Sequence, residues 1–172
     1  MKKRILLTSF DIWLPHQQSN SSDDLLIEVG KLNSLAHDFT FLRQLPVDVQ
    51  LASSKVQAKI DELKPNYIIC CGMAESRKKL SVEKIASYAE NILQTTVDLE
   101  QLVAEATAIE ISHDCGKFVC VRVVSRRAYL SQKQLTVRCI FAHVPVLTQE
   151  NLMGILADSV LIINKLALSS SC

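Results

Sequence analysis

The stretch NYIICCG, residues 66–72, is a continuous apolar run that closes on a glycine. Such a run is typical of a strand buried on both faces, as in a parallel sheet that helices cover on each side. Working outward, RILLTSF (4–10) and FTFLRQLPV (39–47) predict two further strands. The intervening DDLLIEVGKL (23–32) has helical spacing, and VQLASSKVQAKIDEL (49–63) predicts a helix that stops before a proline.

The second half of the chain continues this alternation. Two strands are predicted at TAIEIS (107–112) and LTVRCIFAHVPV (135–146), and a possible strand at LSVEKIASY (80–88). Two helices are predicted at VDLEQLVAEA (97–106) and ENLMGILADSVLIINKLAL (150–168). The segment FVCVRVVSRRAYLSQK (118–133) is ambiguous between helix and strand. Strands separated by helices of this length predict βαβ units. We therefore expect a single domain over residues 1–172, of α/β class, built as a three-layer α/β/α sandwich with a mostly parallel sheet.

Composition excludes several classes of protein. Of 172 residues, 48% are hydrophobic and 22% charged, and the formal net charge is +1. This balance gives no reason to expect a nucleic acid or a membrane as partner. The short basic runs SRKK (76–79) and SRR (125–127) are expected to be solvated. The apolar run near the amino terminus is too short for a signal peptide, so we expect a cytoplasmic protein.

The six cysteines are expected as thiols, because a cytoplasmic protein rarely keeps a disulfide framework. No CxxC pair or zinc-finger spacing occurs. His113 and Cys115 are two residues apart, as two metal ligands can be, but further ligands would have to come from scattered positions, so no metal is expected. No glycine-rich phosphate-binding loop is present either. We therefore expect no cofactor.

A candidate site follows from the sheet. In open parallel sheets, ligands bind beyond the carboxyl ends of the strands. Segments expected there contain Cys120 and His143, and Glu83 lies about ten residues past a strand end. A thiol paired with an imidazole, itself oriented by a carboxylate, is the arrangement of a cysteine nucleophile. On pattern alone, however, Cys120 and His143 also fit the core, and Glu83 also fits the surface.

Comparison of the segments with a known protein family favours the catalytic interpretation of Cys120, His143 and Glu83 over the core and surface interpretations. ILLTSFDIW (5–13), LPVD (45–48) and KPNYIICCG (64–72) occur in the same order as segments of the pyroglutamyl peptidases, also called pyrrolidone-carboxylate peptidases. These are cysteine peptidases that remove an amino-terminal pyroglutamate. The resemblance covers most of residues 4–168 in unbroken order.

Three further segments carry the resemblance at the reactive positions. RKKLSVEKIA (77–86) is similar to the family segment that holds an arginine and the catalytic glutamate. ISHDCGKFVC (111–120) resembles the nucleophile segment, and FAHVPVL (141–147) resembles the segment of the catalytic histidine. The resemblance therefore implies three catalytic residues, Glu83, Cys120 and His143, and it leaves Cys115 at a small packing position.

The differences from the family concentrate on the side of the substrate. IWLPH (12–16) replaces a Pro-Phe-Gly-Gly turn, and in MAES (73–76) a methionine replaces a glutamine and a neighbouring glycine pair is lost. The loop that carries an arginine near the active site is shortened, so that ILQTTVDLEQL (92–102) leads almost directly into the next helix. By position we expect five substrate-binding residues: Phe10, Trp13, Val47, Met73 and Val119.

The resemblance thus implies a cysteine exopeptidase that removes a pyroglutamyl or related small acyl group through an acyl-thioester. Its partners would be a peptide or small amide substrate and further copies of itself, in a homo-oligomer such as a dimer or tetramer. The alternative is a catalytically inactive relative that binds a ligand or protein through a remodelled pocket. Thiol reactivity at Cys120 distinguishes the two hypotheses.

Overall fold

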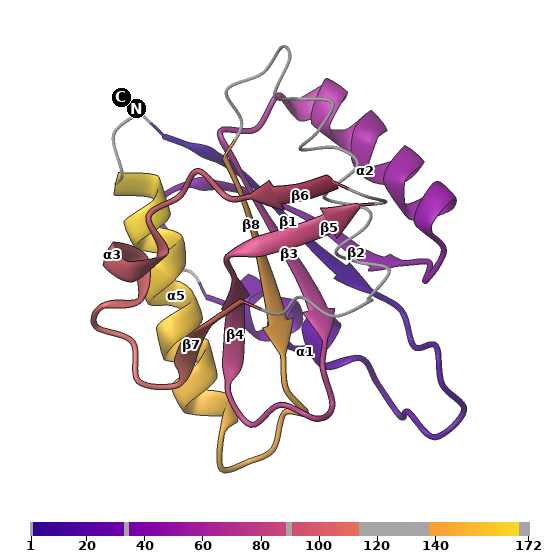
Figure 1. The fold of residues 1–172 in the computed structure, drawn as a ribbon, viewed down its shortest axis with the longest axis vertical. Helices are drawn as coiled ribbons and strands as arrows, with labels where there is room; N and C mark the ends of the chain where they lie inside the picture. The colour runs from indigo at the N-terminus through magenta and orange to yellow at the C-terminus, as the bar shows by residue number, and fades with distance from the viewer. Residues whose placement is uncertain (1, 33–34, 89–90, 114–137, 169–172) are drawn as a thin grey trace.

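A computed structural model describes the chain except for residues 1, 33–34, 89–90, 114–137 and 169–172 (Figure 1). Its centre is a six-stranded sheet in the order β2-β1-β3-β8-β4-β7. The strands are β1 (Arg4–Phe10), β2 (Asp38–Leu45), β3 (Tyr67–Met73), β4 (Leu80–Glu83), β7 (Ile109–Ser112) and β8 (Arg138–Val144). The first four strands of that order are parallel, whereas β4 pairs antiparallel with β8 and β7 runs with β4.

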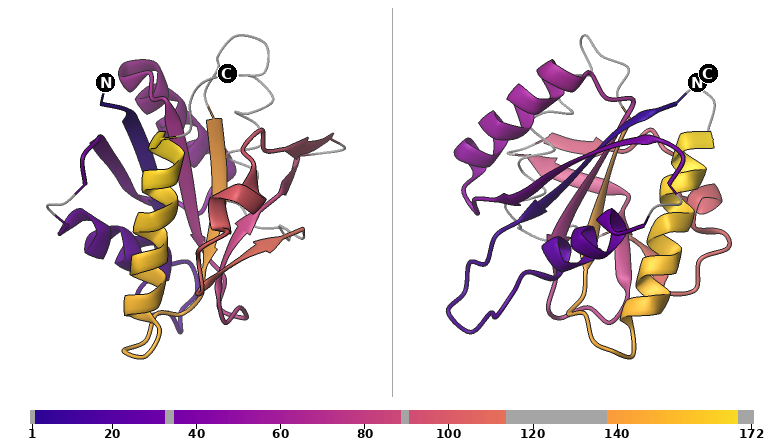
Figure 2. Two further views of the ribbon diagram at one scale, coloured as in Figure 1. Left: turned by 90° about the vertical axis from the view of Figure 1, so that its left-hand side faces the viewer. Right: turned by 180° about the vertical axis from the view of Figure 1, so that it is seen from behind.

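Helices cover both faces of the sheet. On one face, α1 (Ser21–Gly30), α3 (Leu99–Val103) and α5 (Leu152–Leu168) share a core cluster with alternate residues of the strands. On the other face, α2 (Val49–Leu63) packs in a second cluster with the remaining alternate residues. Figure 2 shows α5 and α1 together on one side, with α2 away from them. The three-layer α/β/α arrangement and the mostly parallel sheet are therefore confirmed.

The helix boundaries follow from local chemistry. The side chain of Asn20 accepts a hydrogen bond from the backbone N–H of Ser22 at the start of α1, and Asp48 caps α2 in the same way. At the end of α2, Lys64 has a positive φ of 46°, a left-handed conformation that stops the helix before Pro65. The quoted stretch 66–72 corresponds to β3, whose first six residues are buried, as the unbroken apolar run predicts.

The second half differs in detail from the sequence-based prediction. The segment 80–88 forms two strands, β4 and β5 (Ile85–Tyr88), with a bend at Lys84 between them. β5 pairs antiparallel with β6 (Asn91–Gln94), a strand that the sequence analysis missed. α3 is also shorter than the predicted helix over 97–106. The ambiguous segment 118–133 lies outside the described residues.

The described helices include none with the length and apolar character needed to cross a membrane.

Candidate active site

His143 and Glu83 form a buried pair. The Nδ1 atom of His143 lies 2.6 Å from Oε1 of Glu83, and the two side chains are almost completely excluded from solvent. The ring of His143 also meets the ring of Phe141 edge-on, with centroids 4.6 Å apart. The carboxylate and the aromatic contact together fix the orientation of the imidazole.

Strand register explains why residues 60 positions apart meet. β8 pairs antiparallel with β4, and Ser81 lies directly opposite His143. Side chains alternate along a strand, so Glu83 projects from the same face as Ser81, two residues further along. From that diagonal position its carboxylate reaches the imidazole. Cys139, Phe141 and His143 are alternate residues of β8 and share one face of the sheet, and the first two lie in or against the α2-side core cluster.

Arg77 is the third member of this arrangement. Its Nη1 atom lies 2.8 Å from Oε1 of Glu83, so a single carboxylate oxygen contacts both the guanidinium and the imidazole. The side chain of Arg77 is only 19% exposed. The expectation that the basic run 76–79 is solvated is therefore wrong for Arg77, although Lys78 and Lys79 are exposed. The signal that could have identified Arg77 is its place in the segment that resembles the family's arginine and glutamate.

Burial determines the protonation state of His143. Desolvation lowers the pKa of His143 below its ordinary value of 6.5, and the positive charge of Arg77 acts in the same direction. The hydrogen bond and the charge of Glu83 oppose this shift without cancelling it. His143 is therefore neutral at pH 7, the form in which an imidazole accepts a proton.

The predicted nucleophile lies outside the described residues, as do Cys115 and Val119. Of the cysteines in the described ranges, Cys70 and Cys71 are buried and Cys139 is partly buried, and all three are free thiols. Burial raises the pKa of Cys71, and the contact with the Cys70 thiol, together with burial, raises the pKa of Cys139. Such thiols are poor nucleophiles at neutral pH, consistent with roles in the core. No group of three or more potential metal ligands gathers in the described parts of the chain.

Four of the five residues predicted to bind substrate lie within the described parts of the chain. Phe10 is 4% exposed and belongs to the α2-side core, and Val47 packs against the same cluster. Met73, at the end of β3, is partly buried, and its sulfur lies 3.5 Å from the backbone nitrogen of Ser21. Trp13 is 48% exposed. Trp13 is thus the most accessible of the four.

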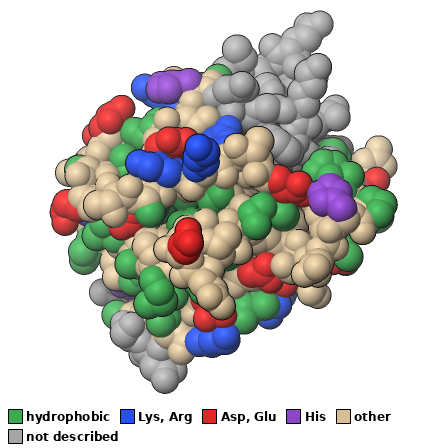
Figure 3. Space-filling model, turned by 90° about the horizontal axis from the view of Figure 1, so that it is seen from below, with side chains coloured by type: hydrophobic (Ala, Val, Ile, Leu, Met, Phe, Trp, Pro, Cys, Tyr) green, Lys and Arg blue, Asp and Glu red, His purple; other side chains and the backbone are tan. Residues whose placement is uncertain are grey.

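The carboxyl ends of β1, β3 and β8 lie at the same end of the sheet, whereas β7 runs in the opposite direction. β7 therefore ends, at Ser112, at the opposite end of the sheet from the carboxyl ends of β1, β3 and β8, contrary to the expectation from an all-parallel arrangement. Figure 3 shows the molecule from below, with small groups of hydrophobic side chains among charged ones. No broad apolar patch is visible among the coloured residues of this view.

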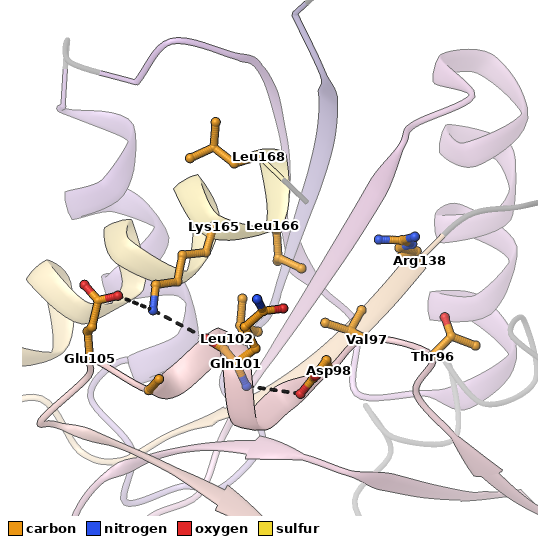
Figure 4. Close-up of a pocket in the computed structure, with 11 residues that line it drawn as sticks. Thr96, Val97, Asp98, Gln101, Leu102, Glu105, Arg138, Lys165, Leu166 and Leu168 are labelled. Atoms are coloured by element: carbon orange, nitrogen blue, oxygen red, sulfur yellow. Dashed lines mark hydrogen bonds and ion pairs between the residues drawn. The ribbon is translucent and has the colours of Figure 1, made fainter. Parts of the chain in front are cut away.

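A groove of about 670 Å³ lies elsewhere. Arg138 and Leu168, at the amino end of β8 and the last turn of α5, are among its lining residues (Figure 4). In it, Lys165 forms an ion pair with Glu105 at 3.1 Å and donates to the carbonyl of Gln101. Neither Glu83 nor His143 lines this groove. It is separate from the buried pair and is not the candidate active site.

Comparison with known proteins agrees with the resemblance read from the motifs. A pyrrolidone-carboxylate peptidase of Pseudomonas fluorescens is 28% identical, in an alignment over 85% of this chain and 80% of that protein. One of Brevibacillus brevis is 25% identical over 86% and 80%. Over most of its length the chain is thus similar in sequence to pyrrolidone-carboxylate peptidases. No protein-family profile matches the chain.

Solved structures of pyrrolidone-carboxylate peptidases share the fold. The pyrrolidone carboxyl peptidase of Thermococcus litoralis aligns with a TM-score of 0.82 at 18% identity, covering 96% of this chain and 93% of that one. The pyroglutamyl peptidase I of Bacillus amyloliquefaciens gives the same TM-score at 16% identity, covering 98% of each chain. The fold is therefore preserved where most of the sequence has changed.

Proposed function

We propose that the chain is a cysteine exopeptidase that removes an amino-terminal pyroglutamyl group, with Cys120 as nucleophile, His143 as base and Glu83 as the group that orients His143. The observation that supports this most strongly is the buried contact of 2.6 Å between His143 and Glu83. An imidazole held by a carboxylate is the general base of many cysteine and serine hydrolases. The related peptidases supply the substrate class.

The reaction proceeds in two steps. His143 removes the proton of the Cys120 thiol, and the thiolate attacks the carbonyl carbon of the pyroglutamyl amide. The C–N bond breaks as the imidazolium returns the proton to the leaving amine, which leaves an acyl-thioester. His143 then deprotonates a water molecule, which attacks the thioester, and free pyroglutamate and the thiol are released.

Glu83 and Arg77 assist without touching the reacting atoms. The contact of Glu83 with Nδ1 favours the tautomer in which Nε2 is the proton acceptor, and it stabilises the imidazolium that forms during the reaction. Arg77 contacts the same oxygen of the carboxylate and helps to hold it in place. Both are positioning residues for His143.

The first experiment measures release of a fluorescent amine from its pyroglutamyl amide. We expect turnover by the unaltered protein, none by Cys120→Ala, and nearly unchanged turnover by Cys115→Ala, the matched control. We expect Glu83→Gln to keep its fold and to lose activity by about 10²-fold, within the range of general acid–base contributions. No turnover by the unaltered protein, or full turnover by Cys120→Ala, contradicts the proposal.

The second experiment measures thiol reactivity. The protein is treated with iodoacetamide from pH 5 to pH 9, and the modified cysteine is located by mass spectrometry. An activated Cys120 should be labelled rapidly near pH 6–7, well below the ordinary thiol pKa of about 8.5. The rate should fall in His143→Ala. Labelling of Cys120 at the rate of an ordinary thiol contradicts the proposed pair and favours an inactive relative.

A further inference from the structure

The turn between β3 and β4 contacts the loop that follows β1 through Glu75, and it contacts Glu83 of the buried pair through Arg77. Its backbone is fixed at both ends, because the N–H of Ala74 donates to the carbonyl of Val144 at 2.9 Å and the N–H of Arg77 donates to the carbonyl of Ala74 at 3.1 Å. Glu75 is one of the two central residues of this turn. Arg77, two residues later, forms the ion pair with Glu83. These backbone hydrogen bonds do not involve the side chain of Glu75, so the turn and Arg77 keep their positions when that side chain is replaced.

Glu75 contacts the loop that follows β1. Its Oε1 accepts a hydrogen bond of 2.5 Å from the side-chain amide of Gln17, and its Oε2 lies 3.0 Å from Nε2 of His16. These contacts, the one with Gln17 first, lower the pKa of Glu75. Glu75 is therefore a carboxylate at neutral pH, and it joins residues 58 and 59 positions away.

Gln17 organises this loop from within. Its side-chain oxygen accepts from the backbone N–H groups of Trp13 and Leu14, at 3.0 and 3.2 Å. Its own N–H donates to the carbonyl of Leu14. Only 9% of Gln17 is exposed, so its amide nitrogen depends on Glu75 for a partner. The carboxylate of Glu75 thereby fixes the side chain that holds the backbone at Trp13.

The loop follows the carboxyl end of β1, and His143 lies near the carboxyl end of β8, at the same end of the sheet. β3 separates β1 from β8, and Gly72 of β3 is paired in register with His143. The loop presents Ile12 and Trp13, each about half exposed, on a backbone that is also closed at its base by a hydrogen bond from Asn20 to the carbonyl of Asp11. A half-exposed aromatic ring on an ordered loop is suited to contact a small acyl group.

We propose that Glu75 is a specificity-determining positioning residue, which fixes the loop 11–20 through Gln17 and His16 and so sets the affinity for the acyl group. This inference rests on the proposed function for its substrate. It assigns Glu75 no contact with the reacting atoms. Replacing it should therefore change KM much more than kcat.

Trp13 is the only tryptophan of the chain, so its fluorescence reports on the loop without any catalytic assay. In Glu75→Ala we expect a red-shifted emission and an acrylamide quenching constant about twofold higher, because a loop that loses its contacts samples open conformations. Glu75→Gln keeps an oxygen that can accept from Gln17 and should be intermediate. Glu62→Ala removes a surface glutamate that pairs with Lys59 on α2, and as the matched control it should change nothing.

The kinetic measurement uses the same variants and the pyroglutamyl amide. For Glu75→Ala we expect KM to rise about fivefold with kcat nearly unchanged, and partial recovery in Glu75→Gln. Unchanged Trp13 quenching in Glu75→Ala overturns the proposal, as does altered quenching with an unchanged KM. If the unaltered protein has no turnover, the proposed function has failed, and the affinity of each variant for free pyroglutamate, followed by Trp13 fluorescence, decides this inference instead.

Discussion

At the scale of single residues, one oxygen atom of Glu83 contacts both other ionisable groups of the site. Oε1 of Glu83 contacts both His143 and Arg77, whereas Oε2 is buried without a hydrogen-bond partner among the described residues. A buried polar atom without a hydrogen-bond partner typically costs about 1–3 kcal/mol, and such atoms are few in native structures. The carboxylate is therefore held by Arg77 and His143 through one oxygen, and loss of either partner should be costly.

Arg77→Ala should destabilise the fold as well as reduce activity. Removing one partner of a buried ion pair typically costs about 3–5 kcal/mol, and we expect the lower part of that range because Arg77 keeps some contact with solvent. Urea unfolding measures the difference. Arg77→Lys should recover part of the loss, and the exposed Lys78→Ala is the matched control. A stability equal to that of the control would show that the ion pair contributes nothing.

The lowered pKa of His143 predicts how stability depends on pH. In the unfolded chain a histidine titrates near 6.5, whereas burial lowers the pKa of His143 in the native state. As the pH falls below 6.5, the unfolded chain binds the proton first, so the free energy of unfolding decreases until the pH reaches the native pKa. Urea midpoints from pH 8 to pH 5 measure this effect.

The same series in His143→Gln gives the control for that prediction. The variant cannot bind a proton at this position, so its midpoint should fall less over the same pH range. NMR titration of the imidazole gives the native pKa directly. A native pKa above 6.5 would contradict the assignment of burial as the dominant effect.

At the scale of elements, the antiparallel pairing of β4 with β8 brings the acid to the base. The parallel pairs of β1, β3 and β8 build the buried centre, whereas the reversed β4 places Glu83 diagonally opposite His143. β7 extends the sheet beyond β4, and its position depends on a contact from α5. Asp158, a residue of α5 that is 8% exposed, accepts hydrogen bonds from the backbone N–H groups of Thr107 and Ala108, at 2.7 and 2.5 Å.

Asp158→Ala should therefore loosen this end of the sheet. Two N–H groups lose their acceptor, at about 1–3 kcal/mol for each buried unsatisfied group. Because Thr107 is an exposed residue, we expect the lower part of the summed range, a loss of about 2–4 kcal/mol in the free energy of unfolding. Asp158→Asn retains one acceptor oxygen and should lose less. Hydrogen exchange should localise the effect to the amides of residues 107–112. Equal stabilities for the two variants would argue against this role.

At the scale of the whole molecule, two separate core clusters enclose the central strands. The cluster on the side of α1 and α5 contains Cys71, and the cluster on the side of α2 contains Cys70. Neighbouring residues of β3 thus point into opposite cores. Both thiols are almost fully excluded from solvent. Their modification requires the layers to separate.

This arrangement predicts the labelling of the core thiols. Cys70 and Cys71 should resist iodoacetamide in the native protein and react together as urea unfolds the chain, since only global opening exposes them. Mass spectrometry of each cysteine across a urea series measures this. The labelling transition should coincide with loss of the circular dichroism signal. Labelling of either thiol well below that transition would show that one core opens independently.

The sequence by itself determined the strands and helices whose patterns are strong. The buried strand β3, the strand β8 and the helix α2 over 49–63 were predicted correctly, because burial and helical or strand periodicity act on neighbouring residues and leave a local pattern. The position of Glu83 was expected from its family motif. The hairpin of β5 and β6 was missed, because four-residue strands leave too short a pattern to recognise.

Only the tertiary structure decided the direction of β4, the burial of Arg77 and the contact of Glu75 with Gln17. Each depends on residues tens of positions apart, so no local pattern contains it. Strand direction in particular depends on which neighbour a strand pairs with, and a short apolar segment pairs equally well either way. The polar contacts of the site follow from that choice, because a carboxylate becomes a partner only where the folded chain brings a donor to it.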